Sequence, residues 1–297
     1  MRLLHNVKFD FLGKRYKFIT LSAILIAACA LGLIIRGLNL GIDFKGGIVV
    51  EIQFDKPVSL SELRDLFSGA GIGSYELQSV PKRNSVILRA KGQLAQSETI
   101  TGRIKEMLDK SGVVYNVLKT EYVGPRIGKH LSRMAYLAIL FSFLGIIVYV
   151  AIRFKSGIWG VAGVLALVHD VFITVGLFAI FGLEVDLTVV AALLTLAGYS
   201  INDTIVIFDR IRENLVLLRK ESFGEILNTS ICQTLSRTII TSFCTELVVL
   251  TIFLFGGEVI HNFSLALLFG MITGTYSTIF IASPIVYEWM MFKKSRV

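Results

Sequence analysis

Long apolar segments recur six times along the chain, separated by shorter polar stretches. They lie near 18–35, 134–152, 158–182, 187–208, 238–256 and 263–291. Each is long enough for a helix to cross a bilayer, which takes roughly 20 residues. The first, FITLSAILIAACALGLII, is longer than the apolar core of a signal peptide, and no small-x-small cleavage motif follows it. The pattern predicts an α-helical polytopic membrane protein with six transmembrane helices, the first a retained anchor.

The longest polar stretch, residues 36–133, alternates between strand-like and helix-like segments, as a soluble domain does. Its segments are GIVVEIQF (strand), SLSELRDLFSGAG (helix), YELQSV and SVILRA (strands around the turn 81–84), QSETITGRIKEMLDKSG (helix) and VVYNVLKTEYV (strand). Ser59 and Glu62 have the spacing of a helix-capping box. The order predicts one extracytoplasmic α+β ferredoxin-like domain inserted between helices 1 and 2. We expect a scaffold domain without chemistry, because no nucleophile–base arrangement is supported and residues 36–129 contain no His or Cys that could bind a metal.

Composition agrees with a membrane protein. Hydrophobic residues make up 54% of the chain and the mean hydropathy is +0.70, more apolar than a soluble domain of this length needs. The cysteines, Cys29, Cys232 and Cys244, lie in or beside apolar segments and form no CxxC pattern. We therefore predict neither a disulfide framework nor a metal site.

The net charge of +8 is explained by the placement of Lys and Arg. Basic residues concentrate in the N-terminal segment, the turn 153–157, the stretch 209–237 and the tail, whereas the short loops 183–186 and 257–262 have none. The positive-inside rule then predicts that both termini are cytoplasmic and that residues 36–133 face outside. Since topology accounts for the charge, no nucleic-acid partner is predicted.

These patterns divide the chain into three parts. Residues 1–35 form the cytoplasmic N-terminus and first helix, 36–133 the outer domain, and 134–297 helices 2–6 with a cytoplasmic loop at about 209–237. Within that loop, DRIRENLVLLRKE is amphipathic and is predicted to lie on the membrane surface. Pro284 is predicted to kink the last helix.

Candidate chemistry lies in polar residues inside the apolar segments. Asp203, in GYSINDTIVIFDR, belongs to a small and polar helical stripe that also holds Tyr199 and Asn202 and should face other helices. Arg237 opens the fifth predicted span at a similar depth, and it either pairs with Asp203 or anchors the helix by reaching to water. Both interpretations stay open.

His169 and Asp170 lie near the middle of the third predicted span. Either a structural hydrogen bond between helices or a relay role fits them. A buried carboxylate that gains and loses a proton has two charge states that favour different helix packings. A proton that crosses the membrane potential releases about 2.3 kcal/mol per 100 mV. Asp203 is therefore a possible proton switch.

Several motifs, in order, resemble the SecD/SecF family of bacterial protein-export subunits, a branch of the resistance-nodulation-division superfamily. They are GIDFKGG (41–47), GPRIGKHL (124–131), HD (169–170), GYSINDTIVIFDRIREN (198–214) and TLSRTIITS (234–242). The resemblance covers nearly the whole chain. The small outer region and the SIND form of the motif favour the SecF type over the SecD type.

The resemblance implies a location in the bacterial inner membrane and a role in drawing translocating polypeptides outward. It implies SecD as the partner that supplies the other half of a twelve-helix unit, beside the SecYEG channel, the SecA motor, YajC, YidC and membrane lipid. Protons would be the coupling ion, with no other cofactor. The proton-passing Asp and Arg of the family fall on Asp203 and Arg237. The motif with Gly41, Asp43, Gly46 and Gly47 would be a structural junction.

Three alternatives compete with this interpretation. An intramembrane aspartyl protease would need Asp170 and Asp203 to share a proton, but their predicted depths differ by roughly 10 Å at the helical rise. A drug or lipid exporter half of the same superfamily would use similar proton chemistry with larger outer domains. A structural assembly subunit would use its charges only to hold helices together. We do not expect an enzyme.

Overall fold

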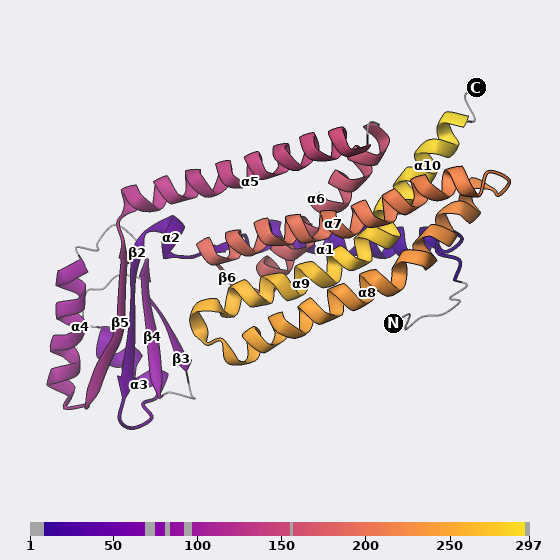
Figure 1. Cartoon of the computed structure of the whole chain (residues 1–297). Helices are drawn as coiled ribbons and strands as arrows, with labels where there is room; N and C mark the ends of the chain where they lie inside the picture. Colours follow the sequence, from indigo (N-terminus) through magenta and orange to yellow (C-terminus); the bar gives the residue numbers. More distant parts are fainter. Residues whose placement is uncertain (1–8, 69–74, 81–83, 92–96, 155–156, 295–297) are drawn as a thin grey trace. The chain divides into compact units, whose positions relative to one another are not determined.

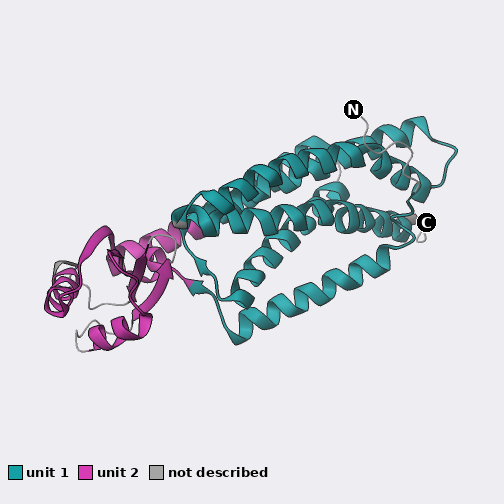
Figure 2. Cartoon of the chain, turned by 90° about the horizontal axis from the view of Figure 1, so that it is seen from below, with its two compact units in different colours: residues 1–39, 138–297 teal, residues 40–137 magenta. Residues whose placement is uncertain are grey.

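The computed structural model describes residues 9–68, 75–80, 84–91, 97–154 and 157–294. Residues 81–83 of the predicted turn at 81–84 lie outside this part, as do the basic residues Arg2, Lys8, Lys155 and Arg296. The chain divides into two compact units, which Figure 2 distinguishes by colour. Unit 1 comprises residues 1–39 and 138–297, and unit 2 comprises residues 40–137.

Within the described residues, six helical segments are long and apolar enough to cross a membrane (Figure 1). They are α1 (Arg15–Ile35), α5 (Pro125–Phe154), α6 (Gly157–Phe181), α7 (Leu187–Leu217), α8 (Phe223–Phe255) and the continuous span His261–Lys293. Short elements in the chain are β1 (Asn39–Leu40), β6 (Glu184–Val185) and the 3-10 helix η2 (Glu258–Ile260). The six predicted apolar segments are confirmed as helices.

The predicted cytoplasmic loop at about 209–237 is helical for most of its length, because α7 continues to Leu217 and α8 already begins at Phe223; its cytoplasmic location stays a prediction. The polar residues that suggested a loop pair with each other across the two helices. Arg210 Nε donates to Gln233 Oε1 at 2.6 Å, and Asn214 Nδ2 donates to Ser230 Oγ at 2.8 Å. The amphipathic segment is therefore not a separate surface helix: Ile211, at its centre, is fully buried in the core of unit 1.

The residues between these helices turn abruptly because of one capping motif. The Ser222 hydroxyl accepts from the Glu225 N–H at 3.3 Å, and the Ser222 N–H donates to Glu225 Oε2 at 2.9 Å. This reciprocal pair is a capping box, which satisfies backbone donors at the start of a helix. Only residues 218–222 are left to join the two helices.

The last span is interrupted by a π-helical segment. Helix α9 (His261–Ser277) leads into η3 (Thr278–Ala282), which leads into α10 (Ser283–Lys294). Pro284 has no N–H, and its ring clashes with the carbonyl group four residues earlier in a regular helix. The Ser283 hydroxyl instead bonds the Thr278 carbonyl oxygen at 3.2 Å. The helix is irregular just before Pro284, in the form of a π turn, while the predicted kink of the helix axis stays a prediction.

The N-terminal segment is attached to α8 by one asparagine. Asn228 Oδ1 accepts from the Phe11 and Leu12 N–H groups, each at 3.1 Å, and its Nδ2 donates to Asp10 Oδ1 at 2.8 Å. Hydrogen bonds from the Gly13 N–H and from Asn228 lower the pKa of the Asp10 carboxyl, and Lys14 also favours its ionised form. Phe11 and Leu12 are thereby held in the core of unit 1.

Helix α1 packs closely on α6 because a glycine faces a cysteine. A Cβ atom built on Gly176 would lie 2.2 Å from Cys29 Cβ and 3.0 Å from Cys29 Cα. The backbones could not stay this close with any side chain at position 176. Cys29 is 1% exposed, so its thiol has no room to move aside.

Replacing Gly176 with alanine is therefore expected to lower the free energy of unfolding by about 2 kcal/mol, the usual cost of overpacking a core. Reversible unfolding in bicelles measures this. Gly145→Ala on α5, where an added Cβ meets nothing within 4 Å, is the matched control and should change little. The double variant Gly176→Ala with Cys29→Gly should regain most of the loss. Equal stability of both single variants would contradict the packing argument.

In the described residues, unit 2 is a four-stranded antiparallel sheet with three helices, of which α3 and α4 pack on one face of the sheet. The strands are β2 (Gly47–Phe54), β3 (Tyr75–Val80), β4 (Ser85–Lys91) and β5 (Tyr115–Val123), in the order β3-β4-β2-β5. The helices are α2 (Ile42–Lys45), α3 (Leu60–Ser68) and α4 (Ser97–Ser111). Val50 of the central strand pairs with Leu88 on one side and Thr120 on the other.

Alternation along β2 explains the core of unit 2. Ile48, Val50, Ile52 and Phe54 are buried on one face of the sheet, and they share a core with residues of α3 and α4. The residues that α3 and α4 contribute are Leu63, Phe67, Ile100, Ile104 and Leu108. The predicted capping box of α3 is confirmed, with mutual bonds between Ser59 and Glu62 at 3.2 Å.

The glycine-rich motif at the start of unit 2 forms a tight backbone turn. Gly46 and Gly47 have φ angles of 74° and 150°, which favour glycine. A Cβ on Gly46 would lie 3.2 Å from Pro125 Cα, so the motif also touches GPRIGKHL. Gly41 differs from the prediction: its φ of −69° suits any residue. Asp43 lies in the first turn of α2.

Candidate functional site

Helix α7 lies at the centre of the helical unit, between α6, α8 and α9 (Figure 1). Small residues on α9 allow the approach. A Cβ on Gly270 would lie 2.3 Å from Leu196 Cδ2, and one on Gly274 would lie 3.2 Å from Ser200 Cβ. Gly270 and Gly274 thus allow the part of α7 that carries Ser200 and Asp203 to pack closely on α9.

Asp203 is buried on α7 and is hydrogen-bonded to a hydroxyl chain. It is 6% exposed, and its Oδ2 accepts from Ser242 Oγ of α8 at 3.2 Å. Thr275 Oγ1 of α9 donates to the same Ser242 oxygen at 3.0 Å. The carboxylate therefore contacts α8 directly and α9 through one hydroxyl. The expectation that it faces other helices agrees with this geometry.

Arg237 is not in contact with Asp203. Among the described residues, the ion pairs do not include one between these two side chains, and Arg237 is exposed. Its charge acts on Asp203 over a longer distance. Because α8 begins at Phe223, Arg237 lies within the helix, about 21 Å from its start, and does not open it.

Tyr199 and Asn202 take different positions. The Tyr199 hydroxyl donates to Thr245 Oγ1 on α8 at 3.3 Å, while Asn202 is exposed. Two faces of the helical unit are exposed and carry small or polar side chains. They comprise Ala191, Thr195, Gly198 and Asn202 on α7, and Arg237, Thr241 and Cys244 on α8. Such residues are costly against lipid and favourable against another helix.

Asp170 is enclosed by three helices. It is 0% exposed, and its Oδ2 accepts from Ser200 Oγ of α7 at 2.6 Å and from Ser277 Oγ of α9 at 2.7 Å. Its Oδ1 lies 3.0 Å from His169 Nδ1. The two acids bind different hydroxyls, and no hydrogen bond within the described residues joins them. A shared-proton protease dyad does not fit this arrangement.

The hydroxyl partners of both acids were not singled out from the sequence. Ser200 and Ser242 lie inside quoted motifs. Ser200, three residues before Asp203, shares its helix face and could have been identified by that spacing, whereas Ser242, five residues after Arg237, could not. Ser277 and Thr275 carry no such signal, because isolated hydroxyl residues are common in membrane helices.

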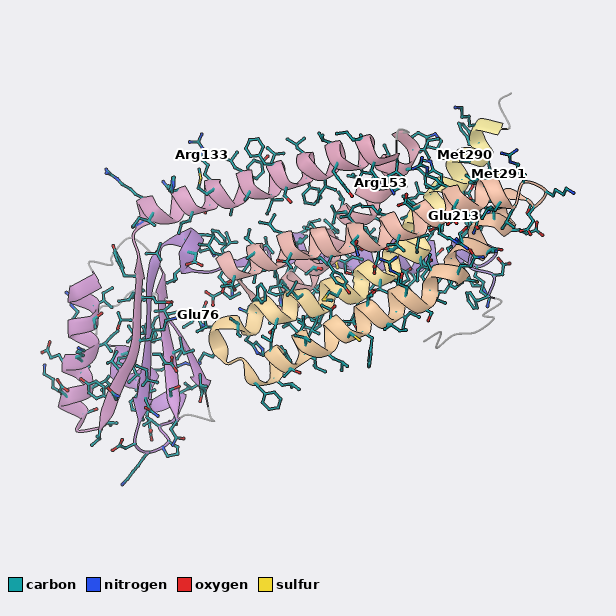
Figure 3. The ribbon with its side chains drawn as sticks, viewed as in Figure 1. Glu76, Arg133, Arg153, Glu213, Met290 and Met291 are labelled. Carbon is teal, nitrogen blue, oxygen red and sulfur yellow. The ribbon has the colours of Figure 1, made fainter. Side chains whose placement is uncertain are left out.

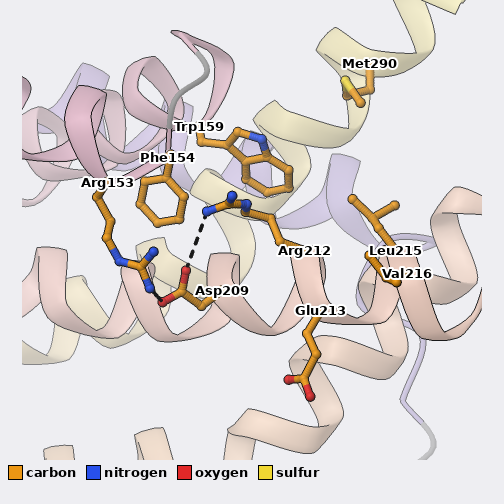
Figure 4. A pocket seen from close by; sticks show the side chains of 9 residues that line it. All are labelled: Arg153, Phe154, Trp159, Asp209, Arg212, Glu213, Leu215, Val216 and Met290. Carbon is orange, nitrogen blue, oxygen red and sulfur yellow. Dashed lines mark hydrogen bonds and ion pairs between the residues drawn. The ribbon is translucent and has the colours of Figure 1, made fainter.

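A second acid of the α7 motif, Asp209, is placed in a pocket at one end of the helical unit (Figure 4). It pairs with Arg153 of α5 and lies 4.0 Å from Arg212. Figure 3 shows Arg153, Glu213 and Met290 at this end. The pocket has a volume of about 720 Å³. Since Asp209 is already bound to arginine, it holds helices together at this end.

Comparison with known proteins identifies the family. The family described as Protein export membrane protein SecD/SecF, C-terminal, matches residues 103–292, and the SecD/SecF GG motif matches residues 32–58. The chain is 44% identical to Protein translocase subunit SecF of Endomicrobium trichonymphae, covering 100% of this chain and 96% of that one. It is 43% identical to Protein translocase subunit SecF of Vibrio alginolyticus, covering 90% and 85%.

Two solved structures are similar over almost the whole chain. One is SecDF of Thermus thermophilus, described as a translocon-associated membrane protein, with a TM-score of 0.87 and 37% identity. It covers 96% of this chain and 39% of the SecDF chain. SecDF in a super-membrane-facing form has a TM-score of 0.74 and 36% identity, covering 99% and 40%. The present chain thus spans about two fifths of the solved SecDF chains.

The family match includes the described helices that carry Asp170, Asp203 and Arg237, and the relatives are similar along nearly their whole length. On these matches the chain belongs to the SecD/SecF family of protein export membrane proteins.

Proposed function

We propose that the protein couples the proton gradient to the late stage of polypeptide export, as a SecF-type subunit that works with SecD. The observation that carries this proposal is Asp203, an almost fully buried acid in a membrane helix that contacts a serine hydroxyl and not a basic side chain. Because no basic side chain contacts Asp203, the surrounding helices must hold it both as a neutral acid and as a carboxylate. Acids of this kind in membrane helices mark proton relays in pumps and transporters.

SecD is the proposed partner because of what unit 1 leaves exposed. The small and polar faces of α7 and α8 lie beside Asp203 and include Arg237. A second six-helix half on these faces would bury Arg237 and bring its own polar groups to Asp203. The SecYEG channel, SecA, YajC and YidC belong to the same proposal as the assembly in which export takes place.

The proposal includes a location and an orientation. The six apolar helices place the chain in a membrane. The basic ends of α5 and α7, with Arg153, Arg210 and Arg212, support a cytoplasmic location for that end under the positive-inside rule. Both termini would then be cytoplasmic in the inner membrane. Unit 2 would be periplasmic, and its strand order β3-β4-β2-β5 supports a ferredoxin-like fold.

A photo-reactive amino acid at Asn202 is expected to cross-link to co-expressed SecD, because Asn202 lies on the exposed small and polar face of α7. The same probe at Leu165, which is 48% exposed on α6, is the matched control and should give little or no cross-linked product. Immunoblots for SecD after irradiation of intact membranes measure both. If SecD co-purifies and cross-links strongly at Leu165 but not at Asn202, then SecD binds the face that carries Leu165, and the proposed interface is wrong.

A reconstituted system tests the coupling itself. Vesicles that hold the SecYEG channel, SecA, SecD and this subunit should export more completely when a proton gradient is imposed. A protonophore should remove that gain. Export that is equally complete with and without the gradient would reject the proposal, even if SecD is bound.

A further inference from the structure

A chain of hydrogen bonds, unrelated to Asp203, links α1 to the His169–Asp170 pair. The Tyr276 hydroxyl of α9 bonds the carbonyl oxygen of Phe18 at 2.7 Å. Ser22 Oγ lies 3.0 Å from the Tyr276 oxygen and 3.2 Å from His169 Nε2. The last link joins His169 Nδ1 to Asp170 Oδ1 at 3.0 Å.

The direction of every bond in this chain is determined at its α1 end. A carbonyl oxygen only accepts, so Tyr276 must use its single hydroxyl proton on Phe18. Ser22 must then donate its proton to the Tyr276 oxygen. With that proton used, the Ser22 oxygen can only accept from His169, and Nε2 of the imidazole must therefore carry a proton.

The protonated Nε2 leaves two arrangements for the His169–Asp170 bond. Either Nδ1 is also protonated and an imidazolium donates to an ionised carboxylate, or Nδ1 is bare and accepts from a protonated carboxyl. Both arrangements contain the same number of protons and have no net charge. A neutral imidazole facing an ionised Asp170 would place two lone pairs against each other.

We propose that His169 and Asp170 form a second proton-binding site in the membrane, which holds one shared proton and is linked through Ser22 and Tyr276 to α1. The ligand is a hydrogen ion, and the site is separate from Asp203. The inference does not depend on the proposed function, since it follows from hydrogen-bond direction alone.

The surroundings of the pair agree with a neutral site. Asp170 is 0% exposed and His169 is 6% exposed, and an isolated carboxylate at this depth is costly. The groups that face the pair are Ser22 of α1, Ser200 of α7, and Tyr276 and Ser277 of α9. Tyr276 is the one titratable group among these contacts. The nearest acid on α7, Asp203, bonds Ser242 instead.

Nitrogen NMR of the full-length protein in nanodiscs tests the proposal. The chain has four histidines, so histidine is labelled with ¹⁵N and the His169 signals are assigned by their loss in His169→Gln. We expect Nε2 of His169 to be protonated at every pH at which the protein is folded. A protonated Nδ1 with a bare Nε2 would overturn the proposal.

Tyr276→Phe provides the decisive variant. Without the Tyr276 hydroxyl, Ser22 is free to donate to Nε2, and the tautomer with protonated Nδ1 and bare Nε2 becomes available. A substantial fraction of His169 should adopt it. Tyr136→Phe, at a side chain 67% exposed on α5, should leave the His169 spectrum unchanged. If Tyr276→Phe also leaves it unchanged, the hydroxyl chain does not control the proton and the proposal fails.

Asp170→Asn gives an independent readout should Tyr276→Phe fold poorly. The Asn amide donates to Nδ1 and its oxygen accepts from both serines, so the variant imitates the proton-loaded site. His169 should then be neutral, with protonated Nε2 and a hydrogen-bonded bare Nδ1. An imidazolium signal in this variant would contradict the shared-proton assignment.

Discussion

Replacing Asp203 with asparagine is expected to reduce export in the presence of a proton gradient to the level measured without one. Asparagine has nearly the same shape and still accepts from Ser242, so the packing of α7 on α8 is retained. It cannot bind or release a proton in this range of pH. The measurement is the yield of protected preprotein in vesicles with SecD and the channel, with and without a protonophore.

The matched control for this variant is Thr273→Val on α9, whose hydroxyl, among the described residues, bonds only the Phe269 and Gly270 carbonyl oxygens of its own helix. It removes a polar group of the helical unit without changing the proton chemistry or the proposed SecD face, and it should keep the response to the gradient. Complex assembly is followed by co-purification of SecD. If Asp203→Asn assembles normally and still exports in a gradient-dependent manner, the carboxylate only holds helices together, and the structural-subunit alternative is correct.

Replacing Asp170 with alanine is expected to lower the free energy of unfolding by about 2–3 kcal/mol. The substitution removes the acceptor for Ser200 and Ser277 and the partner of His169, and interhelical hydrogen bonds in membranes contribute roughly 0.6–1.7 kcal/mol each. Buried groups left without partners add to the loss. Reversible unfolding in bicelles, with the variant at equal concentration, gives the difference directly.

Asp170→Asn is the control for this stability measurement, because its amide can satisfy all three partners. It should lose less than about 1 kcal/mol. The ratio between the losses in the free energy of unfolding of the two variants separates the effect of lost hydrogen bonds from the effect of lost side-chain volume. Wild-type stability of Asp170→Ala would mean that the serine and histidine contacts contribute nothing to the packing of α6, α7 and α9.

The periodicity of hydrophobic residues was enough to predict those elements whose apolar side chains are buried on one face of the element. Strand β2 alternates buried and partly exposed residues, and its predicted bounds agree with Gly47–Phe54. The residues after Phe208 were predicted as a loop, because charged residues in a sequence are expected to face water. Arg210 and Asn214 are satisfied by Gln233 and Ser230 of the neighbouring helix, and only tertiary structure supplies such partners.

The candidate site was predictable in its acids but not in their contacts. An ionisable residue in an apolar segment is conspicuous, so Asp170 and Asp203 could be identified from the sequence. Their partners depend on helix rotation, which a single sequence does not determine. The pairing of Asp203 with Arg237 was one of two open interpretations, and in this structure α8 presents Ser242 to Asp203 and leaves Arg237 exposed.

The π turn at Thr278–Ala282 immediately follows Ser277, the α9 donor to Asp170. A π turn contains one residue more than an α-helical turn of the same span. Moving that surplus residue along the helix rotates the segment it crosses by about 100°. A rotation of that size would carry Ser277 away from Asp170, so the hydrogen bond between these two side chains depends on where the π turn lies in the last span.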